Sequence, residues 1–341
     1  MSKPNNGTVA VSITGSTTVD KWNLIGNPYP SAIDVEKFLL ANNTVLDGTV
    51  YLWTHNTPVN NLVYTSNDYA TYNFTGSLGT GFGDNASTEP NTVVNTPTKY
   101  IGAGQAFFAK GIANGTTTAN FRNNMRETGN NTQFFRPTAE ENVAMSPFSQ
   151  HKVWLNLTND QGAFSQTLVG YIPEATNGLD WGFDGDLFGG NYVAFYSIES
   201  GKNLAIQGRA LPFVTSDEVP LGFNTTLSGD FTIAIDHLYD FEDQDIFLED
   251  QDMNIIHNLK DSAYTFSATA GTYDERFVLK YSANTILDLP THKIQKPLVY
   301  KDSQNEIVVT SKISDLQQIR IYDVSGRLVY DRTMSILKKS R

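Results

Sequence analysis

The chain has 341 residues, with 24 Lys and Arg against 36 Asp and Glu, so its formal net charge is −12. This acidic balance argues against nucleic acid and anionic membranes as partners, because both bind basic surfaces. The absence of cysteine excludes disulfides, thiolate metal sites and cysteine nucleophiles. Apolar residues make up 40% of the chain, which is enough for a hydrophobic core.

Short apolar runs with alternating polarity dominate the chain and predict β-strands. Gly, Asn, Asp and Thr separate them and predict turns. Because no helical pattern connects these strands, we expect an all-β fold of two antiparallel β-sandwich domains of jelly-roll or Ig-like type, with a partial third sandwich at the C-terminus. The predicted strands lie at 8–15, 48–55, 152–159, 166–172, 191–199, 202–208, 230–236, 245–250 and 276–282.

One short helix is predicted near residues 31–42, where the sequence is SAIDVEKFLLAN. Ser31 could cap its N-terminus, with Asp34 three residues later as in a capping box. The apolar side chains of Ile33, Phe38 and Leu39 could then form one stripe against a sheet edge. Asn42 and Asn43 would end the helix.

Changes in composition predict the domain boundaries. Residues 1–127 would form the first sandwich, which begins inside a domain, and the polar segment 128–150 would connect it to a second sandwich at 151–283. Residues 284–297 contain two prolines and would lead into a partial sandwich at 298–341.

The segment 180–191 is the best candidate for a metal site, because it alternates Asp and Gly. Carboxylate and carbonyl oxygens in such a loop can bind Ca²⁺, and we expect Asp184, Asp186 and Asn191 to be the ligands. The loop lacks the closing Glu of the twelve-residue calcium pattern. The alternative is a Gly-rich turn whose aspartates accept hydrogen bonds from nearby backbone amides.

Four aromatic residues near a long Gly/Asn/Thr loop could form a platform on which a sugar ring stacks: Trp53, Tyr64, Tyr69 and Tyr72. Aromatic residues on β-sheets also form cores, and that is the alternative here. The acidic turns at 240–245 and 249–252 flank a predicted strand and are interpreted as a solvated rim.

The sequence contains no recognisable catalytic motif, and its five histidines have no spacing typical of a metal site. A pair of carboxylates distant in sequence could still meet in a cleft and hydrolyse a glycosidic bond. The chain is nevertheless predicted to be non-catalytic, because its acids fall mostly at turns and strand ends.

The stretch KWNLIGNPYPSAID at 21–34 resembles a family of large secreted bacterial surface proteins that are cargo of the type IX secretion system. The resemblance continues through most of the chain. It rests further on segments 48–58, 67–73, 102–110, 120–126, 155–186, 206–213 and 276–282.

The tail resembles the C-terminal sorting domain of such cargo, whose signature is a strand, a Y/F-D-x-x-G-[RK] turn and a second strand. The matching residues are Tyr322, Asp323, Gly326 and Arg327. Alternation of Ile319, Ile321, Leu328 and Tyr330 also predicts a hairpin around this turn. The resemblance implies that the type IX translocon reads this small sandwich. In the family the sandwich continues through further strands, so we expect the chain to be a fragment.

These observations predict a segment of an exported protein at the outer surface of a diderm bacterium, or released from it. The sequence shows no apolar run long enough for a membrane span, and we expect its first residues not to act as a signal peptide. Its predicted work is display, adhesion or glycan binding, with Ca²⁺ as the candidate cofactor. One alternative is an accessory region of a polysaccharide- or protein-degrading hydrolase whose catalytic domain lies upstream. Another is a sandwich cleft that itself cuts polysaccharide.

Overall fold

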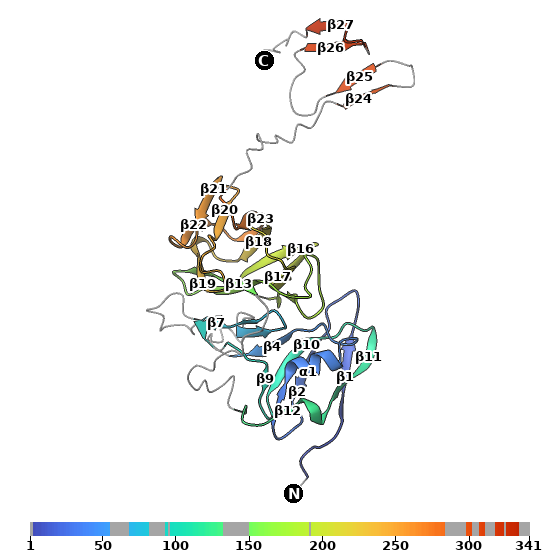
Figure 1. The fold of residues 1–341 in the computed structure, drawn as a ribbon, viewed down its shortest axis with the longest axis vertical. Helices are drawn as coiled ribbons and strands as arrows, with labels where there is room; N and C mark the ends of the chain where they lie inside the picture. The colour runs from blue at the N-terminus through green and yellow to red at the C-terminus, as the bar shows by residue number, and fades with distance from the viewer. Residues whose placement is uncertain are drawn as a thin grey trace. The chain divides into compact units, whose positions relative to one another are not determined.

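A computed structural model describes residues 3–54, 68–81, 93–94, 96–131, 150–190, 192–283, 298–301, 307–310, 318–323 and 325–333. The chain divides into two compact units, Met1–Ala283 and Asn284–Arg341. The described residues are nearly all in strands and the loops between them, which confirms the all-β prediction (Figure 1). A strand occurs in every one of the nine segments where alternation predicts one.

Residues 3–131, here the N-terminal region, contain short strands and one α-helix. Their bounds are β1 Val9–Gly15, β2 Trp22–Gly26, β3 Ala32–Asp34, α1 Val35–Ala41, β4 Val50–Trp53, β5 Tyr69–Tyr72, β6 Ser77–Leu78, β7 Thr80–Gly81, β8 Val93–Val94, β9 Tyr100–Ile101, β10 Ala106–Lys110, β11 Gly115–Phe121, the 3₁₀ helix η2 Asn123–Met125 and β12 Arg126–Glu127.

The N-terminal region is built from a five-stranded sheet, a long two-stranded ribbon and a small three-stranded sheet. The five-stranded sheet has the order β2-β10-β4-β5-β6, the ribbon pairs β1 with β11, and the small sheet has the order β12-β3-β9. Helix α1 joins the ribbon to the larger sheet, because the ring of Phe38 lies 4.4 Å from that of Phe121 and 5.7 Å from that of Phe107.

The helix starts later than the capping-box pattern predicts, and the predicted cap at Ser31 is wrong. Residues 32–34 form β3 instead, and Ile33 pairs with both Arg126 and Ile101. Asp34 is the cap, because its Oδ1 accepts the backbone N–H groups of Glu36 and Lys37 at 3.0 and 3.2 Å. Pairing on both sides of β3 therefore outweighs the local capping preference. The predicted end at Asn42 is confirmed.

Residues 150–283, here the central region, form one large sheet. Its strands are β13 His151–Asn159, β14 Phe164–Tyr171, β15 Gly185–Asp186, β16 Val193–Glu199, β17 Lys202–Arg209, β18 Glu218–Thr225, β19 Gly229–Tyr239, β20 Phe247–Asp250, β21 Ile255–Asn258, β22 Tyr264–Ala268 and β23 Gly271–Lys280.

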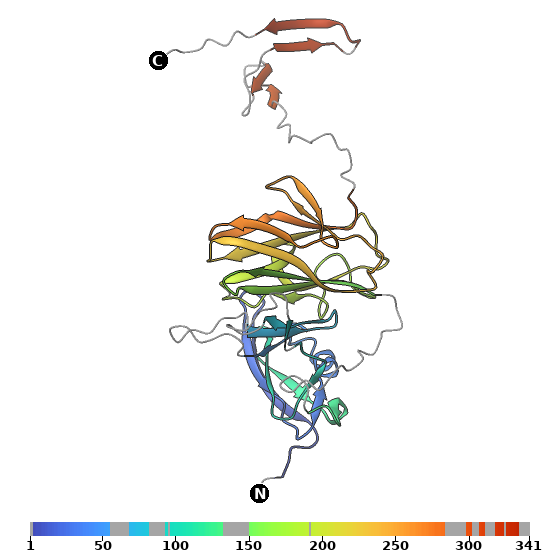
Figure 2. The ribbon, with the colours of Figure 1, turned by 90° about the vertical axis from the view of Figure 1, so that its left-hand side faces the viewer.

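The central sheet has the order β21-β20-β23-β18-β16-β17-β14-β13-β19-β22, and β15 also pairs with β17. It bends back on itself, so that strands from both ends of the order share one core (Figure 2). The ring of Phe266 in β22, for example, lies 4.8 Å from that of Phe277 in β23. β14 and β17 are parallel. Parallel neighbours need a long connection, and the connection from β14 to β17 includes residues 172–190.

The second unit contains two described hairpins. β24 Leu298–Lys301 pairs with β25 Ile307–Thr310, and β26 Gln318–Tyr322 pairs with β27 Leu328–Thr333. The hairpin predicted around the Asp323 turn is therefore confirmed. The side chains of β27 are exposed along its whole length.

Candidate functional site

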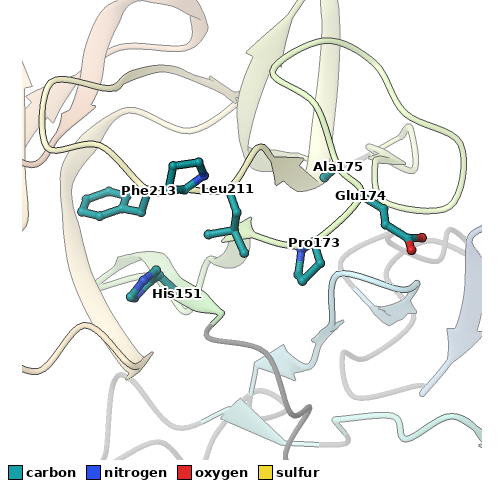
Figure 3. Close-up of a pocket in the computed structure, with 7 residues that line it drawn as sticks. His151, Pro173, Glu174, Ala175, Leu211 and Phe213 are labelled. Atoms are coloured by element: carbon teal, nitrogen blue, oxygen red, sulfur yellow. The ribbon is translucent and has the colours of Figure 1, made fainter.

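A cavity of about 540 Å³ opens at one edge of the central sheet (Figure 3). β13 begins at this edge, and β14 and β17 end there, because β13 is antiparallel to β14 and β14 is parallel to β17. The loops that follow β14 and β17 thus come together with the first residue of β13. The cavity is lined by His151, Pro173, Glu174, Ala175, Leu211, Pro212 and Phe213.

The imidazole of His151 is held by stacking and by one hydrogen bond. Its ring lies 5.1 Å from that of Phe241 and 5.4 Å from that of Phe213. Its Nδ1 lies 2.5 Å from the carbonyl oxygen of Asp240. A carbonyl can only accept, so Nδ1 carries the hydrogen and Nε2 holds the lone pair in the neutral ring. Nε2 is therefore the atom of this imidazole left for an occupant of the cavity.

Phe213 separates the cavity from a buried polar network. Its ring lies 4.9 Å from those of both Tyr171 and Tyr281. Behind it, Arg209 donates from Nε and Nη2 to the two carboxylate oxygens of Asp217, both at 2.7 Å. The hydroxyl of Tyr171 donates to the same carboxylate at 2.6 Å. Burial raises the pKa of both tyrosines, so their hydroxyls stay protonated.

Glu174 lies at the rim of the cavity, in a tight turn. The N–H of Ala175 donates to the carbonyl of Ile172 at 3.2 Å, which closes the turn. Glu174 has a φ of +74°, a backbone conformation that favours glycine. Its side chain is exposed, and Figure 3 shows the carboxylate pointing away from the other lining residues. The cavity wall itself is thus mainly apolar, with one imidazole, and one carboxylate lies at the rim and points outward.

The predicted calcium segment lies elsewhere, at a contact between the N-terminal and central regions that we call the joint, formed by residues 46–51 and 180–186. The carboxylate of Asp184 accepts the N–H groups of Gly208 at 2.9 Å and Asp180 at 2.6 Å. This is the arrangement of the alternative interpretation, in which the aspartates bond to backbone amides. Burial raises the pKa of Asp184 to about 6.

Asp186 contacts residues of the N-terminal region through both its carboxylate and its backbone carbonyl. The carboxylate forms an ion pair with Lys110, which is nearly buried, and lies 3.6 Å from Nζ of Lys202. The carbonyl accepts the hydroxyl of Tyr51 at 2.7 Å. Asp184 and Asp186 therefore both have protein partners, and Asn191 lies outside the described residues. In the part of the chain that the structure describes, no group of three His, Asp or Glu is placed to hold a metal ion.

The backbones of the two regions approach each other closely at the joint. Trp181 donates from Nε1 to the carbonyl of Leu46 at 2.7 Å. Gly48, with a φ of +90°, faces Gly182 so closely that a Cβ at Gly48 would lie 2.5 Å from the Cα of Gly182. Two glycines are thus required where the regions meet.

The structure separates the predicted aromatic platform. Trp53 pairs with Tyr69 across β4 and β5, so their side chains share one face of the sheet. Tyr72 pairs with Val50 on the opposite face and packs against the core, and its hydroxyl donates to Glu36 at 2.7 Å. The Tyr69 ring lies 4.4 Å from that of Phe188, next to the joint. Tyr64 lies outside the described residues.

The residues of the predicted sorting motif form one turn. Oδ1 of Asp323 accepts the N–H groups of Ser325 and Arg327, both at 3.0 Å. Gly326 takes a φ of +80°, which explains glycine at this position. Nε of Arg327 lies 3.2 Å from Oδ2 of Asp323, and Tyr322 ends β26 with half of its surface exposed. Asp323 therefore organises the turn.

Comparison with protein families matches residues 1–281 to a family described as "Domain of unknown function (DUF8693)". The chain belongs to this family. No curated protein and no solved structure matches the chain. The matched residues of the DUF8693 domain include the cavity and the joint, whereas the β26–β27 hairpin follows them.

Sequence reasoning missed the cavity of the DUF8693 domain. Its lining combines the start of one strand with loops 22 and 60 residues further on, as the numbers of His151, Pro173 and Leu211 show. Pro173-Glu174 and Leu211-Pro212 are ordinary turn signals, and nothing local marks them as neighbours.

Among the described residues, no helix is long and apolar enough to cross a membrane.

Proposed function

We propose that this chain is a non-catalytic segment of an exported surface protein, and that the cavity of the central region binds an extracellular ligand. In this proposal the N-terminal and central regions are two antiparallel β-sandwich domains, and residues 298–341 are part of a third. The protein would act in surface display and adhesion, with a glycan or another extracellular molecule as its ligand.

The lining of the cavity is the observation that carries the proposal. Five of its seven residues are Pro, Ala, Leu or Phe, and its volume of about 540 Å³ is in the usual range for small-ligand sites. Glycoside hydrolysis needs two carboxyl groups on either side of the scissile bond, and the lining offers one, that of Glu174. Such a wall favours binding over bond cleavage.

The export part of the proposal rests on the resemblance to type IX cargo and on the Asp323 turn. The hydrogen bonds from Ser325 and Arg327 give this turn a defined shape that a translocon could read. A reporter fused to residues 284–341, expressed in a bacterium with type IX secretion, tests this part. We expect any export of the reporter to be lost with Asp323→Ala and kept with Asp331→Asn, a change in β27 away from the turn.

A binding screen of the purified chain on immobilised glycans, with and without Ca²⁺, tests the binding part. Saturable binding that Phe213→Ala abolishes, with Trp53→Ala unchanged, would support the cavity as the site. The reverse pattern would move the site to the face of β4 and β5. Binding that needs Ca²⁺ and is lost in Asp184→Asn would support the calcium prediction. No binding to any ligand class, glycans and peptides included, would contradict the binding part.

A further inference from the structure

The cavity wall is apolar where an occupant would be most enclosed. Pro173, Leu211 and Phe213 line it, and Phe213 packs against the rings of Tyr171 and Tyr281 behind it. A group that enters loses water on the side of these residues. An apolar stem gains free energy from that loss, whereas a polar stem would lose hydrogen bonds.

The polar side chains at the cavity can accept hydrogen bonds from an occupant. The carboxylate of Glu174 can only accept, and Nε2 of His151 accepts in the neutral ring because Nδ1 donates to Asp240. The Asp240 carboxylate lies 3.6 Å from Nδ1 of the same imidazole and adds negative charge behind it. The ligand that complements this wall therefore carries donors, and a cation complements it best.

Two cations lie near these groups, and neither reverses the negative charge. Both carboxylate oxygens of Asp217 bind the guanidinium of Arg209. The ammonium of Lys260 donates to the carbonyl of Glu242 and keeps its charge, but the acidic turn at 240–245 carries four carboxylates against it. The net charge of −12 on the whole chain acts in the same direction.

From this wall and its charges we infer that the cavity binds a basic side chain on an apolar stem, as in a peptide segment that carries Lys or Arg beside Leu or Phe. The inference rests on the proposed function, because it takes the cavity as the binding site, and it names the class of ligand. The stem would lie along Leu211 and Phe213, and the cationic end would leave the cavity at the rim, on the side to which the exposed carboxylate of Glu174 points.

Fluorescence anisotropy with two labelled peptides tests the inference on the full chain. One peptide alternates Lys and Leu, and the other alternates Glu and Leu, so the sign of the charge is reversed while the Leu residues stay the same. We expect saturable binding of the basic peptide alone, and weaker binding as salt is raised, because salt screens charges at the rim. Glu174→Gln should weaken it about two- to fivefold, the usual size for a partly exposed ion pair.

Asp160→Asn is the matched control for Glu174→Gln. Asp160 is an exposed acid in the turn at the other end of β13, so the same change in net charge occurs far from the cavity. Binding of the basic peptide should stay unchanged in this variant. Equal weakening by both substitutions would show that only net charge matters, and would overturn the inference. Phe213→Ala should weaken binding through the stem, with a folded state verified by circular dichroism.

The remaining outcomes separate this inference from the proposed function. Equal binding of both peptides, lost in Phe213→Ala, would overturn the charge preference and leave the cavity as a binding site. Glycan binding at the cavity without peptide binding would do the same. If neither peptide binds and the glycan screen is also negative, the inference and the binding part of the proposed function both fail.

Discussion

The joint and the cavity are two places where loops of the central region could meet a ligand, and they differ in what satisfies their polar groups. At the joint, the carboxylates of Asp184 and Asp186 bind backbone amides and lysines of the protein itself. At the cavity, His151 uses Nδ1 internally and leaves Nε2, and the carboxylate of Glu174 points outward.

This difference shows why a dense run of acids and glycines is a poor guide to a ligand site. The glycines of segment 180–186 allow close backbone contact, and its acids fix one region against the other. The cavity has fewer polar groups, and its wall is mainly apolar. A site is thus marked by a hollow with polar groups at its wall and rim, and the following substitutions test this contrast.

The largest effect is expected from Gly48→Ala in the joint. A Cβ there would lie 2.5 Å from the Cα of Gly182 and would also require a left-handed φ of +90°. Overpacking together with this strain should lower the free energy of unfolding by about 3 kcal/mol. Urea denaturation followed by tryptophan fluorescence would measure it, since Trp181 lies at the same contact.

Gly104→Ala is the control for the steric part of this effect. Gly104 has a φ of +72° in the same region, but a Cβ there would have nothing within 4 Å. The cost should therefore be that of the left-handed conformation alone, about 1 kcal/mol. Equal losses in the two variants would mean that the close contact between Gly48 and Gly182 is unimportant, and the joint would be looser than described.

Lys110→Met should destabilise the chain somewhat less. The lysine pairs with Asp186 and lies 3.6 Å from Asp20, and its loss leaves the Asp186 carboxylate with Lys202 as its remaining cation. We expect a loss of about 2 kcal/mol, below the usual cost of breaking a buried pair because Lys202 compensates in part. A double-mutant cycle with Asp186→Asn would measure the coupling, and additive effects would contradict the ion pair.

The pH dependence of the free energy of unfolding should reveal the protonation of the Asp184 carboxylate. Burial raises its folded-state pKa from 3.8 to about 6, so the folded chain binds this proton more tightly than the unfolded chain. The resulting stability is fully present below the unfolded pKa and is lost as the pH rises through about 6. Asp184→Asn removes this loss, and because the carboxylate is only partly buried we expect its stability relative to the parent to rise by about 1–2 kcal/mol, less than the roughly 3 kcal/mol of the full shift.

Urea midpoints of the parent and of Asp184→Asn, taken at several pH values between the two pKa values and above them, would reveal this change. Asp47, whose pKa burial also raises to about 6, remains in both proteins and cancels in the comparison. Parallel pH profiles would show that Asp184 is not desolvated at the joint.

The strands could be predicted from the sequence because alternation is a local property, as in β13 and β19. The start of α1 could not, because Ile33 pairs with Arg126 and Ile101, which lie far along the chain. The packing of segment 180–186 against the N-terminal region could not be predicted either, because Trp181 binds Leu46, which lies 135 residues away in the sequence. The turn at Asp323 was predictable, since its hydrogen bonds stay within four residues. Local signals gave the elements, and long-range contacts decided what the loops do.

The smallest effect should be a stabilisation, and it concerns the rim of the cavity. Glu174 holds a φ of +74°, which glycine adopts without strain, so Glu174→Gly should stabilise the chain by about 0.5 kcal/mol. Asp160→Gly, in an exposed turn where the structure shows no such strain, should instead lose about 0.5 kcal/mol to the greater freedom of the unfolded chain.

Paired thermal and urea unfolding of these two variants would test whether strain is really stored at the rim. A loss of stability in Glu174→Gly as large as that in Asp160→Gly would show that the glutamate is relaxed where it stands. A gain would mean that the chain keeps a carboxylate at the cavity at the expense of its own stability. The joint shows no such conflict, because at Gly48 and Gly182 the residue that the backbone requires is the residue present. A gain in Glu174→Gly would therefore show that the rim, unlike the joint, does not carry the residue that its backbone conformation favours.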